Sequence, residues 1–189
     1  MARVEVLVNG YARADGEVSR VAGTVSLIRA PGLVAVVDPG MVADQRDILD
    51  PLAAAGIAPD DVTDVIVSHH HPDHTINVGL FGAATVHDHW ATYRGDVWTD
   101  RPAEGAVLAD GVTLWATPGH TPQDISTVVH TDDGVVVLTH LWWHATMVGD
   151  PRATDADLLH AGRARVLEVA ARIVPGHGPA FDVTTSTPR

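Results

Sequence analysis

The sequence has 189 residues and a mass of 20.0 kDa, with 46% hydrophobic and 19% charged residues, which excludes a disordered chain and fits one domain. The absence of cysteine excludes disulfides, thiolate metal sites and cysteine nucleophiles. Twelve arginines and no lysine stand against twenty-four acidic residues, so the net charge of −12 argues against a surface that follows nucleic-acid phosphates.

The first part of the chain predicts strands followed by a helix. Three β-rich runs, typical of an antiparallel meander, occupy residues 4–8, 23–29 and 33–38. From Asp44 onward the apolar residues follow helical spacing, and Gly56 fits the end of that helix. Pro51 falls inside this run, so the sequence predicts a kink or a break there.

Histidines follow several of the later predicted strands. The apolar run 64–68 leads directly into His69-His70-His71-Pro72-Asp73-His74. In the same way residues 111–116 precede Pro118-Gly119-His120, and residues 134–139 precede His140. A predicted helix over 155–171 and a short strand lead to Pro175-Gly176-His177, and the Thr/Ser-rich tail from about residue 184 is expected to fray. The recurring unit suggests two similar halves that meet at a shared edge.

Six of these residues have the side chains and spacing of metal ligands. The pattern His69-x-His71-x-Asp73-His74 packs four potential ligands into six residues at the end of a strand. Two such histidines and a third would complete one nitrogen site, and Asp73 and His74 with another histidine would form a second site beside it. His120 and His177 are the obvious completing ligands, since the glycine before each lets the backbone turn sharply with no Cβ in the way.

These motifs resemble the metallo-β-lactamase superfamily. The runs 23–28 and 36–40 also match the early strands of that family, so the resemblance covers roughly residues 20–180. It implies an α/β (α+β) fold, a four-layer αββα sandwich, formed here by a single domain over 1–189. By the family pattern, one metal would be held by His69, His71 and His120, and the other by Asp73, His74 and His177.

The sequence departs from the family pattern at His140. The family usually has an aspartate there that bridges both metals, and a neutral imidazole offers one lone pair to one ion. Three outcomes are open: His140 binds one ion terminally, Asp150 replaces the bridging carboxylate, or the site is mononuclear. We favour the first.

The resemblance implies a metal-dependent hydrolase. Metal-bound hydroxide would attack a small ester, thioester, lactone or related acyl substrate, and Asp73 would orient the water or move its proton. Zn²⁺, one or two per chain, is the expected cofactor, although Fe or Mn suit nitrogen and oxygen ligands as well. The chain has no lysine for the carboxylate-binding role that a lysine has in antibiotic-hydrolysing members, which argues against β-lactamase activity.

Some residues near the expected site have two readings. Trp142, Trp143 and His144 directly follow His140 and could form an apolar substrate wall, but packing in the core is as good an interpretation. Asp38 could orient a ligand histidine or cap a turn. His70 lies between ligands and is expected to point away from them.

Two other functions fit the same ligands: iron-dependent oxygen chemistry, and a catalytically weak metal-binding scaffold protein suggested by the missing bridging aspartate. The expected partner is a small-molecule substrate, with no nucleic acid and no membrane. No apolar run approaches the roughly 20 residues of a membrane span, which makes a cytoplasmic location the default expectation. A homodimer remains one option for the assembly.

Overall fold

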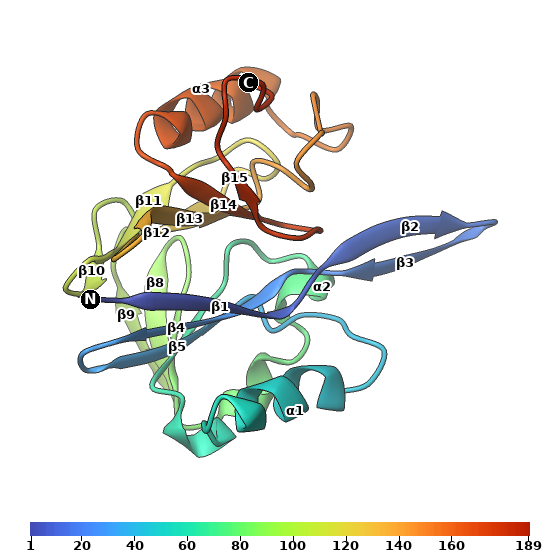
Figure 1. Cartoon of the computed structure of the whole chain (residues 1–189). Coiled ribbons are helices and arrows are strands. Elements are labelled where there is room, and N and C mark those ends of the chain that lie inside the picture. The colour runs from blue at the N-terminus through green and yellow to red at the C-terminus, as the bar shows by residue number, and fades with distance from the viewer.

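Two stacked β-sheets with helices on their outer faces form the body of the protein in the computed structural model, which describes residues 1–189 (Figure 1). The seven-stranded sheet contains, in spatial order, β1 (Arg3–Val8), β4 (Val25–Ala30), β5 (Leu33–Val37), β6 (Asp64–Ile66), β7 (Thr85–His87), β8 (Ala91–Arg94) and β9 (Val97–Asp100). The six-stranded sheet contains β10 (Val107–Ala109), β11 (Val112–Ala116), β12 (Ile125–Thr131), β13 (Gly134–Thr139), β14 (Arg172–Pro175) and β15 (Phe181–Asp182).

Two longer helices lie outside the two sheets, and one short helix, α2, lies at the end of the sandwich near the base of β3 (Val18–Ala22). They are α1 (Arg46–Ala54), α2 (Pro72–Thr75) and α3 (Ala156–Leu167), with short 3₁₀ turns η1 (Pro59–Asp61) and η2 (Val78–Phe81). In Figure 1, α1 lies under the seven-stranded sheet and α3 lies over the six-stranded sheet. This arrangement confirms the predicted αββα sandwich. No helix is both long and apolar enough to cross a membrane.

Burial on both sides of each sheet explains the continuous apolar runs in the sequence. In β5, Ala35 and Val37 belong to the core between the sheets, whereas Val36 belongs to the core under α1. Ile48 and Leu52 of α1 complete that lower core. A third core lies between the six-stranded sheet and α3, and contains Val128, Val137, Leu141, Trp142, Leu159, Val166, Ala170 and Ile173.

The sequence predicted a kink or a break at Pro51. The helix α1 continues through Pro51, so it does not break there. Proline removes the hydrogen bond to the carbonyl four residues earlier, which belongs to Asp47. Asp47 is exposed and lies in the first turn, where water can solvate the freed carbonyl. The helix ends before Gly56, whose φ of 78° is in the left-handed region, as the sequence predicted.

A hairpin over residues 11–22 and the C-terminal tail differ from the sequence-based expectations, and the strands β7, β8 and β9 were not predicted either. A hairpin of β2 (Tyr11–Asp15) and β3 (Val18–Ala22), which the sequence did not predict, projects from the sandwich in Figure 1. Most of its residues are exposed, so it carries no apolar periodicity. The tail from Thr184, expected to fray, lies against the α3 layer: the Trp142 indole donates a hydrogen bond to the Pro188 carbonyl at 2.9 Å.

Candidate metal centre

Four loops that follow strands meet at one end of the sandwich. The loop after β6 carries the first histidines, and its chain turns into α2 with His71 at the N-cap and Pro72 in the first helical turn. The loops after β11, β13 and β14 carry His120, His140 and His177. In the six-stranded sheet β11, β13 and β14 run in the same direction, and β6 belongs to the facing sheet, so the ends of these strands bring residues more than a hundred positions apart into one cluster.

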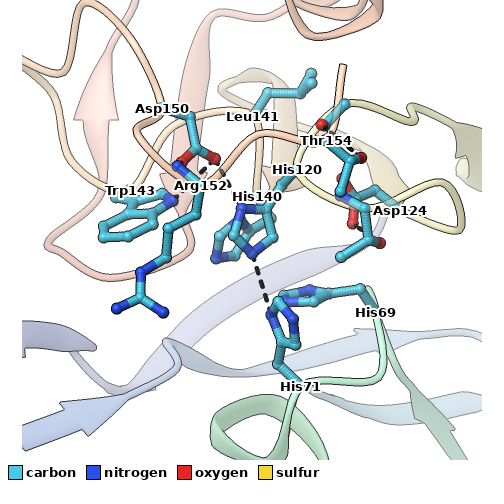
Figure 2. A network of polar contacts seen from close by, with 12 residues as sticks. His69, His71, His120, Asp124, His140, Leu141, Trp143, Asp150, Arg152 and Thr154 are labelled. Carbon is cyan, nitrogen blue, oxygen red and sulfur yellow. Dashed lines mark hydrogen bonds and ion pairs between the residues drawn. The ribbon is translucent and has the colours of Figure 1, made fainter. Parts of the chain in front are cut away.

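The structure brings His69, His71 and His120 together as the first expected group. Their potential ligand atoms all lie within 4.8 Å of one another. The Nδ1 atom of His71 lies 3.0 Å from Nε2 of His69 and 3.1 Å from Nε2 of His120. Figure 2 shows the rings of His69 and His71 facing that of His120 across the junction between the two sheets.

The second expected group, Asp73, His74 and His177, also converges. The Oδ2 atom of Asp73 lies 3.5 Å from Nε2 of His74 and 3.5 Å from Nε2 of His177. Both histidines are buried, and Asp73 is partly exposed toward solvent.

Hydrogen bonds at Nδ1 determine which nitrogen of three histidines faces the cluster. His74 Nδ1 contacts Asp38 at 2.9 Å, His120 Nδ1 contacts Asp150 at 2.8 Å, and His177 Nδ1 contacts the Ala22 carbonyl at 2.9 Å. A carbonyl or ionised carboxylate oxygen only accepts, so each Nδ1 carries the proton and each Nε2 presents a lone pair to the cluster. The Nε2 atom of His74 is buried with no hydrogen-bond partner. Converging lone pairs and an unpartnered buried nitrogen fit a bound divalent cation better than a purely hydrogen-bonded cluster.

The sequence left two roles open for Asp38, to orient a histidine or to cap a turn, and the structure places its carboxylate against His74. Its Oδ1 accepts a hydrogen bond from the Ser68 main-chain N–H at 2.7 Å while its Oδ2 accepts from His74. Its φ of 52° is in the left-handed region, which aspartate tolerates better than most residues. One buried carboxylate therefore fixes both the ring of His74 and the start of the histidine loop.

His140 lies between the two groups. Its Nε2 atom is 3.1 Å from Nε2 of His177, and its ring centroid is 4.2 Å from that of His120. It also falls within 4.8 Å groups with His69 and His74, and with His120 and Asp150. Its buried Nδ1 has no partner. Asp150, considered above as a bridging substitute, instead accepts hydrogen bonds from His120 and from the Trp143 indole at 3.2 Å.

Burial keeps most of the cluster uncharged. Desolvation and the neighbouring histidines lower the pKa of His69 and His140 far below the usual value, and they lower the pKa of His177 to about 4. Burial acts in the same direction on His74, but the carboxylates of Asp38, Asp73 and Asp124 together outweigh it, and the pKa of His74 is raised. Neutral imidazoles can bind a metal without first losing a proton.

The glycines before His120 and His177 are needed for space rather than for a left-handed turn. Neither Gly119 nor Gly176 has a positive φ. A Cβ on Gly176 would lie 2.4 Å from Cδ2 of His140, and a Cβ on Gly119 would lie 2.7 Å from Cα of Leu159. Of the two reasons suggested by the sequence, the lack of room for a Cβ is the one that the geometry supports.

A cavity of about 460 Å³ opens onto the cluster. His71, Asp73, His120 and His177 form its floor, and Trp143 forms part of its wall. Of the three residues suggested for a substrate wall, Trp142, Trp143 and His144, only Trp143 lines this cavity. The Trp142 side chain is fully buried in the core under α3, together with Leu141. His144 is exposed and lines an adjacent hollow of about 440 Å³.

Residues outside the histidine motifs also belong to the cavity, and sequence reasoning missed them. Arg13, Ser19 and Val21 come from the β2–β3 hairpin, Met41 from the loop before α1, and Arg152 from the loop after β13. None follows a strand with a recognisable ligand spacing. His70, as expected, points away from the cluster, and its Nε2 lies 3.1 Å from Asp88.

Comparison with known proteins gives consistent results. The family model described as the metallo-beta-lactamase superfamily matches residues 18–139. The chain is 35% identical over 190 residues to metallo-beta-lactamase domain-containing protein 1 of Xenopus laevis, covering 95% of this chain and 81% of the relative. The rat protein of the same name is 33% identical over 226 residues, covering 95% of this chain and 86% of the relative.

Solved structures share the fold. A putative metallo-beta-lactamase from Thermotoga maritima superposes with a TM-score of 0.77 at 19% identity, covering 96% of this chain and 99% of that one. An N-acyl homoserine lactone hydrolase with its product bound at the catalytic metal centre has a TM-score of 0.67 at 19% identity, covering 93% and 92%. By the match of its sequence, its two-sheet architecture and its strand-end histidines, the chain belongs to the metallo-beta-lactamase superfamily.

Proposed function

We propose that this protein hydrolyses a small ester, thioester, lactone or related acyl substrate with the help of one or two divalent cations, Zn²⁺ being our first choice. The superfamily consists mostly of metal-dependent hydrolases. The observation that carries the proposal is the convergence of histidine lone pairs on the floor of an open cavity. The cavity volume of about 460 Å³ is in the range of small-molecule sites.

The proposed ligand sets follow the two groups of side chains. His69, His71 and His120 would hold one ion, and Asp73, His74 and His177 the other, with His140 as a terminal ligand between them. A cation in such a site supplies Lewis acidity and lowers the pKa of water to about 7.

The chain's own residues divide the remaining work. Asp73 lines the cavity, and we assign its carboxylate to orient the attacking water and accept its proton. Asp38, Asp150 and the Ala22 carbonyl hold three imidazoles in the tautomer that keeps Nε2 unprotonated. Trp143 covers part of the cavity wall and limits the access of bulk water.

The proposal is tested by metal analysis together with hydrolysis assays on chromogenic esters, lactones and thioesters. We expect zinc to bind and support turnover, and the Asp73→Asn variant to lose activity by about 10²–10⁴-fold with its fold intact. Asp64→Asn is the matched control, because Asp64 also contacts a histidine, His87 at 2.7 Å, but does not line the cavity. Iron with oxygen consumption would favour oxygen chemistry, and metal uptake without turnover of any substrate would favour a scaffold protein.

A further inference from the structure

Two arginines without partners line the cavity above the histidine cluster. Arg13 comes from β2 of the projecting hairpin, and Arg152 comes from the loop after β13. Neither guanidinium group forms a hydrogen bond or an ion pair with the protein. The Arg13 guanidinium lies over the ring of Tyr11, 5.3 Å from its centroid, a cation–π contact that leaves its N–H donors free. Arg152 is held through its main chain, whose N–H donates to Asp150 at 2.8 Å.

Arg13 and Arg152 are exposed and keep unpaired charges in an acidic chain, as Arg94 does outside the cavity. Acidic residues outnumber arginines by twenty-four to twelve. Five other arginines, namely Arg20, Arg29, Arg46, Arg165 and Arg172, form ion pairs with carboxylates at 2.7 to 4.0 Å. The two cavity arginines leave their charges available to a molecule that enters the cavity.

The location of the two arginines relates them to the proposed metal centre. Both arginines line the same cavity as His71, His120 and His177. In Figure 2 the side chain of Arg152 extends past Trp143, away from the loop that holds Asp150. Asp73 is the only carboxylate in the cavity lining, and it belongs to the metal-ligand set. The remaining lining contributes no negative charge that could neutralise the arginines.

We propose that Arg13 and Arg152 bind an oxyanion carried by the substrate, a carboxylate or a phosphate-type group, near the bond that is hydrolysed. This inference rests on the proposed function and narrows its substrates to anionic acyl compounds. A guanidinium group presents paired N–H donors that match the two oxygens of such a group. A chain with a net charge of −12 repels anions at long range, so an anionic substrate needs a local positive site of this kind.

The kinetic test compares three thioacetates that release similar alkyl thiols. They are S-acetyl-3-mercaptopropanoate, its neutral methyl ester and S-acetyl-2-mercaptoethylphosphonate, with thiol release followed by a colorimetric reagent. For Arg13→Gln and for Arg152→Gln we expect kcat/KM to fall about tenfold on an anionic substrate and less than about twofold on the methyl ester. Preference between the two anions distinguishes a carboxylate from a phosphate-type group.

Arg94→Gln is the matched control, since Arg94 is exposed, has no hydrogen-bond partner and does not line the cavity. Its kinetics should equal those of the wild type on all three substrates. Equal losses on charged and neutral substrates, or no loss in the Arg13→Gln/Arg152→Gln double variant, would overturn the inference.

A binding measurement on metal-free protein separates this inference from the proposed function. Calorimetric titration at low ionic strength uses succinate and inorganic phosphate as probes, and the double variant should bind the preferred anion at least about tenfold more weakly than the wild type. If the metal-loaded protein hydrolyses none of the thioacetates but this difference is seen, the hydrolase proposal fails and the anion site stands. If wild type and double variant bind both anions equally, the anion site is refuted whatever the hydrolysis assays show.

Discussion

Replacing Asp38 by asparagine should weaken the binding of one of the two proposed metal ions while leaving the fold intact. The two Asp38 oxygens accept hydrogen bonds from the Ser68 N–H at 2.7 Å and from His74 Nδ1 at 2.9 Å. An asparagine amide has only one oxygen, so one of these two donors must face an NH₂ group. The main-chain N–H cannot rearrange, whereas the imidazole can move its proton from Nδ1 to Nε2. Asparagine also tolerates the left-handed φ of 52° at this position.

The expected cost follows from this change of tautomer. A His74 ring protonated at Nε2 has no lone pair toward Asp73 and His177, so the ion proposed for that group loses a ligand. Loss of a carboxylate that supports a ligand histidine typically costs about 10–100-fold in metal affinity, or roughly 1.4–2.7 kcal/mol. The ion proposed for His69, His71 and His120 should be affected much less.

Two measurements test this reasoning. Competition with a chromophoric chelator gives the affinity of each zinc equivalent, and ¹⁵N NMR of histidine side chains in the metal-free variant reports which nitrogen of His74 carries the proton. Asp64→Asn serves as the control, because it alters a carboxylate–histidine pair outside the cluster. Unchanged affinity for both ions in Asp38→Asn, or a His74 ring that keeps its proton on Nδ1, would refute the argument.

Three further predictions concern the cluster and its surroundings. His140→Asp should bind a second zinc equivalent at least about tenfold more tightly than the wild type, because a carboxylate can bridge two ions and an imidazole cannot; equal stoichiometry and affinity by metal analysis would argue against it. Gly176→Ala places a Cβ 2.4 Å from His140 and should lower stability by about 1–3 kcal/mol in thermal unfolding, whereas Gly149→Ala, with open space around it, should not. Metal-free protein should lose stability as pH falls below about 6.5. In this range His177 is protonated in the unfolded chain, but it stays neutral in the folded protein, where its pKa is lowered to about 4. His177 alone contributes about 3 kcal/mol to this loss by pH 4, and His74, whose pKa is raised, acts in the opposite direction. A thermal unfolding midpoint that stays constant from pH 7 to pH 5 would contradict the prediction.

The sequence by itself determined the fold class and the six residues expected to bind metal. Strands buried on both faces leave continuous apolar runs, such as residues 64–68, and a run that ends in His-x-His-x-Asp-His is a local signal that needs no tertiary information. The Pro-Gly-His motifs are also recognisable in the local sequence, although the lack of room for a Cβ at Gly119 and Gly176 comes from Leu159 and His140, which are distant in the chain.

Only the tertiary structure decided which oxygens orient the histidines and what else lines the cavity. Asp38 and Asp150 lie 36 and 30 positions from the histidines they contact, and their distances along the chain follow no periodicity. The β2–β3 hairpin that supplies Arg13 is exposed on most of its surface, so no apolar pattern marked it. Trp142 and Trp143 are adjacent and chemically identical, yet one packs in the core and the other lines the cavity, because the direction of each side chain is set by the backbone after β13. Residue types and short spacings specify the chemistry that a chain can perform, and the packing of distant segments selects the residues that meet to perform it.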